Sequence, residues 1–133
     1  MVVLFKKSPE DIEKKKIIQK KKELKKLAKA KKYDAVLKLG DEILEKRPYD
    51  HDVLFIVGGI YYMKAKYKTA MTFFDKALEI SEYDPDVLLL KANCLFKYGK
   101  IDDSIKLCDK IKEVDPKNKG VQELLLQISK LKK

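Results

Sequence analysis

The sequence of 133 residues predicts an all-α fold, a right-handed α-solenoid of three helix-turn-helix repeats followed by a C-terminal capping helix. Three observations predict it. The segment YDHDVL at 49–54 returns as YDPDVL at 83–88, a shift of 34 residues. Around these segments, apolar residues recur at steps of three and four, as they do on one face of an α-helix. Helix-favouring Leu, Lys, Ile, Ala and Glu dominate, with only five Gly and four Pro.

The 34-residue shift holds over three units. It carries Tyr33 to Tyr67 and then to Ile101, and twice the shift carries Pro48 to Pro116. A fixed period over three units is typical of repeat architectures. The predicted organisation is an N-terminal extension at 1–8, three repeats over 9–118 (about 9–50, 51–84 and 85–118) and a capping helix at 119–133.

Each predicted helix has its own start or stop signal. Ser8 followed by Pro9 and two acidic residues is a helix start, and this first helix is expected to run to about Lys31. Gly99 supplies a turn, because glycine readily takes the left-handed conformation found at helix ends. Pro116 ends a helix, since the residue before a proline avoids the α region. The other helices are expected at 33–46, 52–64, 67–80, 86–98, 101–114 and 119–131.

The apolar positions of the second and third units follow one pattern. They resemble the tetratricopeptide repeat, whose 34-residue unit has the pattern W-x2-L-G-x2-Y, then A-x3-F, then P. The first unit departs from this pattern in its first helix, where Lys20 and Glu23 fill apolar positions. The residues that carry the resemblance are Leu54, Val57, Gly58, Tyr61, Ala70 and Phe74 in the second unit, and Leu88, Lys91, Ala92, Leu95, Ser104, Cys108 and Pro116 in the third.

The uncharged run from Val53 to Met63 is explained by this resemblance. It is too short to span a bilayer, which needs about 20 apolar residues. In stacked helical repeats, neighbouring units share one continuous core, so the first helix of a unit is covered on several sides. We therefore expect Leu54, Val57, Gly58 and Tyr61 to be core residues.

The resemblance also implies a binding surface, because the first helices of stacked repeats line a concave face that binds an extended peptide or a partner helix. Here that groove would be apolar and aromatic. An asparagine in it can donate and accept hydrogen bonds. Two alternatives stay open: the stripe is covered by the chain's first helix or by a second copy in a homodimer, or its exposure is incidental. The candidate groove residues are Phe55, Gly59, Tyr62, Met63, Leu89, Asn93, Phe96 and Lys97.

One well-known groove of this family clamps a C-terminal carboxylate with Lys and Asn side chains spread over three units. Lys21 and Lys25 are placed to supply a first basic pair. The second unit has Phe55 and Gly59 at the matching faces, and the third has Asp86 and Leu90 where basic residues are required. The chain departs from the clamp, and a carboxylate clamp is not expected.

The net charge of +10 is concentrated in the first helix. Residues 1–32 contain thirteen Lys against four acidic residues, whereas the remainder has eighteen Lys or Arg against seventeen Asp or Glu. The alternative hypothesis is therefore a basic RNA- or ribosome-associated helical-repeat protein. The segment has no Arg, and Lys lacks the planar group that stacks on bases. The candidate basic surface, which is otherwise a solvated helix face, consists of Lys14, Lys15, Lys21, Lys22, Lys25, Lys26 and Lys29.

No pattern in the sequence indicates catalysis, a metal or a cofactor. Cys94 and Cys108 are expected to be buried, reduced thiols, and His51 a residue of a capping turn. The start MVVLFKK does not have the form of a secretory signal, and no segment is expected to enter a membrane. The sequence thus predicts a cytoplasmic, non-enzymatic protein-interaction module or assembly adaptor, whose partner it does not identify.

Overall fold

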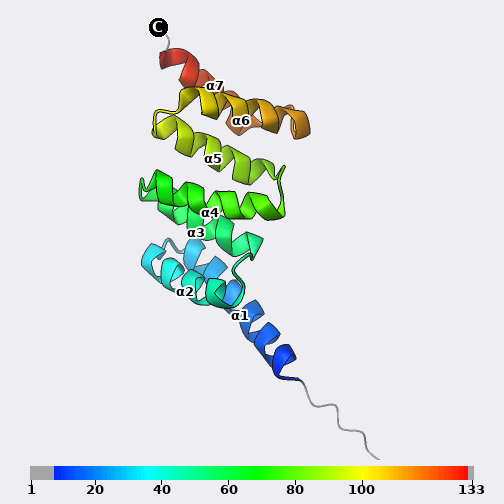
Figure 1. Cartoon of the computed structure of the whole chain (residues 1–133). Helices are drawn as coiled ribbons and strands as arrows, with labels where there is room; N and C mark the ends of the chain where they lie inside the picture. Colours follow the sequence, from blue (N-terminus) through cyan, green and yellow to red (C-terminus); the bar gives the residue numbers. More distant parts are fainter. Residues whose placement is uncertain (1–7, 132–133) are drawn as a thin grey trace, which may run out of the picture. The chain divides into compact units, whose positions relative to one another are not determined.

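The computed structural model describes residues 8–131, and in this range it consists of seven helices and no strands (Figure 1). The all-α, helical-repeat fold class is therefore confirmed. The predicted extension at 1–8, apart from Ser8, and the last two residues of the capping segment lie outside the described residues. The helices are α1 (Pro9–Lys29), α2 (Tyr33–Lys46), α3 (His51–Met63), α4 (Tyr67–Ile80), α5 (Pro85–Lys97), α6 (Ile101–Val114) and α7 (Lys119–Leu131).

The chain divides into two compact units, one ending at Pro48 and one beginning at Tyr49. In the first unit, α1 and α2 form a helical hairpin. The Ser8 hydroxyl caps α1 by accepting a hydrogen bond from the backbone N–H of Asp11 at 3.1 Å. The buried residues of this unit are Ile17, Leu24, Val36, Gly40 and Ile43.

The second unit contains the hairpins α3–α4 and α5–α6, followed by α7. Its two repeated hexamers begin equivalent helices. Oδ1 of Asp50 accepts a hydrogen bond from the N–H of Val53 at 3.2 Å. Oδ1 of Asp84 accepts from Asp86 at 2.9 Å and from Val87 at 3.3 Å. The repeat seen in the sequence is therefore a repeat of N-caps, which satisfy backbone donors that the helix itself leaves without partners.

Within each hairpin of this unit, a small residue lets the two helices approach closely. Gly58 of α3 faces the buried ring of Phe74, and a Cβ on this glycine would lie 2.6 Å from Cε1 of that ring. The corresponding residue of α5 is Ala92, whose carbonyl oxygen accepts a hydrogen bond from the Ser104 hydroxyl at 2.8 Å. A Cβ at Gly58 would therefore force neighbouring atoms to shift, and Ala92 is fully buried.

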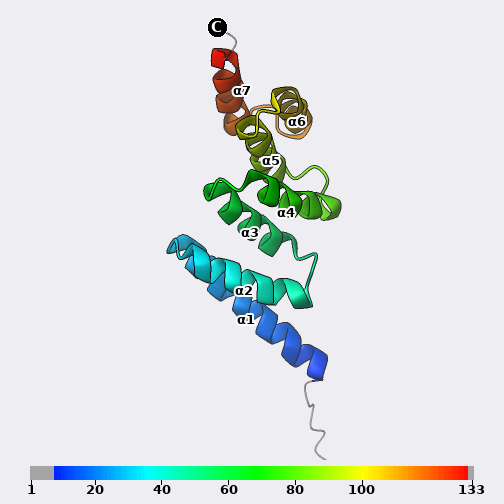
Figure 2. The same ribbon diagram turned by 60° about the vertical axis from the view of Figure 1, so that its left-hand side comes forward.

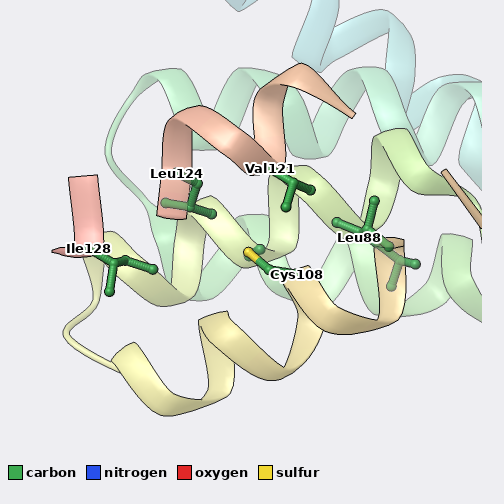
Figure 3. Close-up of a cluster of buried hydrophobic side chains, with 7 residues drawn as sticks. Leu88, Cys108, Val121, Leu124 and Ile128 are labelled. Atoms are coloured by element: carbon green, nitrogen blue, oxygen red, sulfur yellow. The ribbon is translucent and has the colours of Figure 1, made fainter. Parts of the chain in front are cut away.

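Helix α7 packs on both helices of the α5–α6 hairpin (Figures 2 and 3). Its glycine, Gly120, lies directly against the side chain of Leu89, so that a Cβ there would collide with Leu89. The helix thus closes the core of the second unit. The buried cluster that it completes consists of Leu88, Ala92, Cys108, Ile111, Val121, Leu124 and Ile128.

The turns inside the hairpins share one conformation. Gly99 has φ of +87°, as expected for a glycine turn. Two residues without this freedom take equivalent places, Lys31 with φ of +58° and Ala65 with φ of +62°. These three residues are spaced by 34, so the left-handed turn belongs to the repeat rather than to glycine. The sequence did not reveal this at Lys31, because nothing in its side chain favours positive φ.

The neighbouring glycines of α3 should respond in opposite ways to alanine. We expect Gly58→Ala to lower the free energy of unfolding by about 1–3 kcal/mol, because the new Cβ overlaps the buried Phe74 ring. Gly59→Ala should raise it by about 0.5–1 kcal/mol, because no atom lies within 4 Å of the new Cβ and alanine favours the helix. Urea unfolding followed by circular dichroism measures both. Equal effects of the two substitutions would contradict the packing described here.

Candidate functional site

The eight predicted groove residues lie on α3 and α5, which belong to the same compact unit and run in the same direction (Figure 2). The two helices are also in contact with each other. The predicted residues are therefore brought onto neighbouring helices within one body. We call them together the α3–α5 surface, made of Phe55, Gly59, Tyr62 and Met63 from α3 and Leu89, Asn93, Phe96 and Lys97 from α5.

The side chains of this surface differ in exposure. Phe55, Tyr62, Leu89 and Phe96 are all half-buried. Met63 is more open, with 60% of its surface exposed. Lys97 is also exposed. Gly59 is half-buried as a residue, but no atom lies within 4 Å of the place where its Cβ would stand. The aromatic and leucine side chains thus contribute partly to packing, while the open part of the surface runs through Gly59, Met63 and Lys97.

The half-buried members fill the seams between successive helices. The ring centroids of Tyr62 and Tyr67 lie 5.7 Å apart. The pKa of Tyr62 is raised, mainly by burial and to a smaller extent by the neighbouring Cys94 and Tyr67. Leu89 lies against Gly120 of α7, and Phe96 packs on the cluster that α7 completes. The spacing in the sequence could not show these contacts, because it places residues on a helix face without showing which later helix covers that face.

The polar members of the surface have partners within α5. Nδ2 of Asn93 donates a hydrogen bond to the backbone carbonyl of Leu89 at 3.0 Å. The Lys97 ammonium lies over the Phe96 ring, 6.0 Å from its centroid. Asn93 therefore uses one of its two N–H donors inside its own helix, which reduces what it can offer to an extended peptide.

Charged side chains lie at both ends of the α3–α5 surface. Asp52 and Asp86 are exposed in the first turns of α3 and α5. At the other end, Lys97 is exposed in the last turn of α5, and Lys66 and Lys100 are exposed in the turns that follow α3 and α5. Because the two helices are parallel, the surface has one acidic edge and one basic edge. Asp52, Asp86 and Lys97 suit the dipoles of their own helices, whereas Lys66 and Lys100 are the N-cap residues of α4 and α6.

The predicted basic surface belongs to α1 in the first unit. Six of its seven lysines are exposed, and Lys21 is half-buried. Nearby, Lys20 forms an ion pair of 3.8 Å with Glu42 of α2. One group of lysines recurs at helical spacing on the side of α1 away from the buried Ile17 and Leu24. This outward group consists of Lys15, Lys22, Lys26 and Lys29.

His51 makes a contact that sequence reasoning missed. Its buried Nε2 atom lies 3.1 Å from Oδ2 of Asp84, yet the alignment is not that of a hydrogen bond. The contact is therefore an ion pair only when the imidazole is protonated. It brings the first residue of α3 against the residue that caps α5. A lone histidine in a capping segment gave no signal for this pairing, since its partner is 33 residues away.

The two cysteines are free and buried, as predicted from the sequence. Burial raises the pKa of Cys94 to about 12. Burial and the charge of Asp109 raise the pKa of Cys108, and the charge of Lys112 offsets part of this rise. Neither thiol is suited to act as a nucleophile, because thiolate is the reactive form. Over the described range, no group of three or more His, Cys, Asp or Glu is arranged to hold a metal ion.

Comparison with known families agrees with the helical repeat of the structure. The family model described as "Tetratricopeptide repeat" matches residues 61–128, just over half of the chain. The chain belongs to the tetratricopeptide-repeat family. No curated protein sequence matches it significantly. Of the helices between residues 8 and 131, none is both long and apolar enough to cross a membrane.

Solved structures of other tetratricopeptide-repeat domains share the fold. The first such domain of Spaghetti (RPAP3), bound to the HSP90 peptide SRMEEVD, is 19% identical with a TM-score of 0.81, over 88% of this chain and 93% of that one. The Arabidopsis OM64 domain is 11% identical with a TM-score of 0.80, over 87% and 96%. The second domain of human RPAP3, in complex with the HSP70 peptide SGPTIEEVD, is 15% identical with a TM-score of 0.78, over 85% and 94%.

The raised pKa of Cys94 gives a testable difference between the folded and unfolded tetratricopeptide-repeat chain. An unfolded thiol has a pKa of about 8.5. The folded thiol, with a pKa of about 12, should react very slowly with a disulfide reagent at pH 8 and rapidly in urea. Its stabilising contribution should be fully present below the unfolded pKa and lost as the pH rises toward the folded pKa. Mass spectrometry of labelled peptides measures the reaction, with Cys94→Ala as the control. Fast labelling of folded Cys94 would show that the thiol is accessible.

Proposed function

We propose that this tetratricopeptide-repeat protein is a non-enzymatic protein-interaction module or assembly adaptor, which binds a peptide or helix of a partner on the α3–α5 surface. The fold supports the proposal, since related domains of RPAP3 are described in complex with peptides. The observation that carries it is Gly59, in the interior of the most apolar helix of the chain.

Gly59 has no evident use within the chain. A glycine inside a helix costs about 1 kcal/mol relative to alanine. Its neighbour Gly58 offsets this cost by admitting the Phe74 ring, whereas nothing lies within 4 Å of a Cβ at Gly59. Close approach of another molecule is one physical reason for a glycine at such a place. With Met63 exposed one turn further along α3, this point suits the centre of a contact with a partner.

The proposed partner differs from the peptides bound by the RPAP3 domains. Those peptides end in EEVD, and the sequence of the present chain departs from the carboxylate clamp at Gly59, Asp86 and Leu90. An acidic C-terminus would meet Asp86, which is exposed. We therefore propose recognition through apolar contacts and shape, with charge in a secondary role.

Blocking the open position of α3 should remove partner binding without unfolding the protein. We expect Gly59→Gln to reduce capture of the partner from native cell extract at least tenfold, because the new side chain fills the space that the partner would occupy. Thr69→Gln, at an exposed position of α4, is the matched control and should capture normally. Capture is quantified by mass spectrometry at low and high salt.

Two results would count against this proposal. Undiminished capture by the Gly59→Gln chain would place the binding site elsewhere. A dimer of the purified chain that becomes a monomer with Gly59→Gln would show that a second copy occupies the surface, and sedimentation equilibrium distinguishes this case. A dimer has a precedent among the similar structures, since the Yersinia enterocolitica chaperone SycD (16% identity, TM-score 0.71, 86% of both chains) is described as an alternative dimer.

RNA binding by α1 is a second candidate function, favoured by the outward group of exposed lysines, Lys15, Lys22, Lys26 and Lys29. If this surface binds RNA, reversing all four to Glu should abolish retention on an RNA column, and the retention of the unchanged protein should fall steeply with salt. Partner capture through the α3–α5 surface should be unaffected. Equal retention before and after the reversal would exclude α1 as an RNA-binding element.

A further inference from the structure

We infer that the occupant of the α3–α5 surface is an amphipathic helix, which lies antiparallel to α3 and α5 with acidic residues in its first turn and basic residues in its last. This inference rests on the proposed function and gives the chemical class of the partner. Three properties of the surface support it: its small number of polar side chains, its length and its two charged edges.

The polar groups of the surface favour a helix over an extended peptide. An extended peptide presents backbone N–H and C=O groups that require partners when they are buried. The amide of Asn93 already donates to the backbone of its own helix at Leu89. The neighbouring surface residues Gly59, Met63 and Phe96 have no polar side chain. A helix satisfies its backbone groups internally and needs only an apolar face, which Met63 and the half-buried aromatic rings can contact.

The dimensions of the surface also fit a helix. Each of α3 and α5 has 13 residues, which corresponds to a length of about 20 Å. A partner helix of similar length reaches from one end of the surface to the other. The missing side chain at Gly59 allows its axis to come close to α3 near the middle of the contact.

The two charged edges set the direction of this helix. Asp52 and Asp86 lie in the first turns of α3 and α5. Lys97 lies in the last turn of α5, and Lys66 and Lys100 lie in the turns that follow the two helices. A separation of about 20 Å exceeds the Debye length of about 8 Å at physiological salt, so each edge acts on its own end of the partner. Helices commonly have acidic first turns and basic last turns, which complement their dipole. Such a helix matches both edges only when it is antiparallel to α3 and α5.

A display library tests the inference directly. The library consists of 14-residue helical peptides with a fixed apolar face and with Glu or Lys at each exposed position of the first and last turns. Peptides are selected on the unchanged chain after depletion on the Gly59→Gln chain. We expect enrichment of peptides with Glu in the first turn and Lys in the last. A synthetic peptide with this order should bind about fivefold or more tighter than one with the reversed order, and the difference should shrink at high salt.

A protein with exchanged edges provides the matched control. This variant combines Asp52→Lys and Asp86→Lys with Lys97→Glu and Lys100→Glu. It should reverse the preference between the two synthetic peptides, and circular dichroism checks that it folds. Enriched peptides without a charge order, or with the opposite order, would overturn the inference and leave the proposed function standing. No enrichment above the Gly59→Gln chain would overturn both.

Discussion

The close approach of paired helices at Gly58 and Ala92 is the constraint on which the second unit depends. At Gly58 the partner helix supplies the buried ring of Phe74, and at Ala92 it supplies the hydroxyl of Ser104. Interiors are packed as densely as organic crystals, so one extra carbon at Gly58 overlaps the Phe74 ring and forces neighbouring atoms to shift. Helices α3 and α5 are therefore each covered on one side by the second helix of their hairpin and still contact each other on an adjacent side.

This packing explains why an uncharged helix occurs in a highly charged chain. Val53, Leu54 and Val57 of α3 are fully buried, while its opposite side ends in the open position at Gly59 and the exposed Met63. An all-round apolar sequence thus serves two purposes, internal packing and a partly uncovered face. At the C-terminal end of the second unit, Gly120 of α7 lies against Leu89 of α5 and covers part of this side chain.

The sequence was sufficient for the fold because the signals for each helix lie within or next to it and recur with a fixed period. The 34-residue shift, the signals at Ser8, Gly99 and Pro116 and the apolar spacing placed the helix ends within about two residues of those observed. The site was less predictable, because its exposure depends on contacts between distant residues. Leu89 is partly buried by a glycine 31 positions later, and His51 meets Asp84 across one repeat. Neither contact leaves a periodic trace in the sequence.

The left-handed residues Lys31, Ala65 and Gly99 have a consequence for how such a chain can change in length. They mark the same backbone conformation at three points that are 34 residues apart. A duplication or deletion joined at these points brings together residues that already have the same left-handed conformation, so the local backbone geometry of the junction is kept. Growth by whole modules is therefore compatible with the backbone at each of these junctions, and only the helix faces that meet afterwards need to adapt.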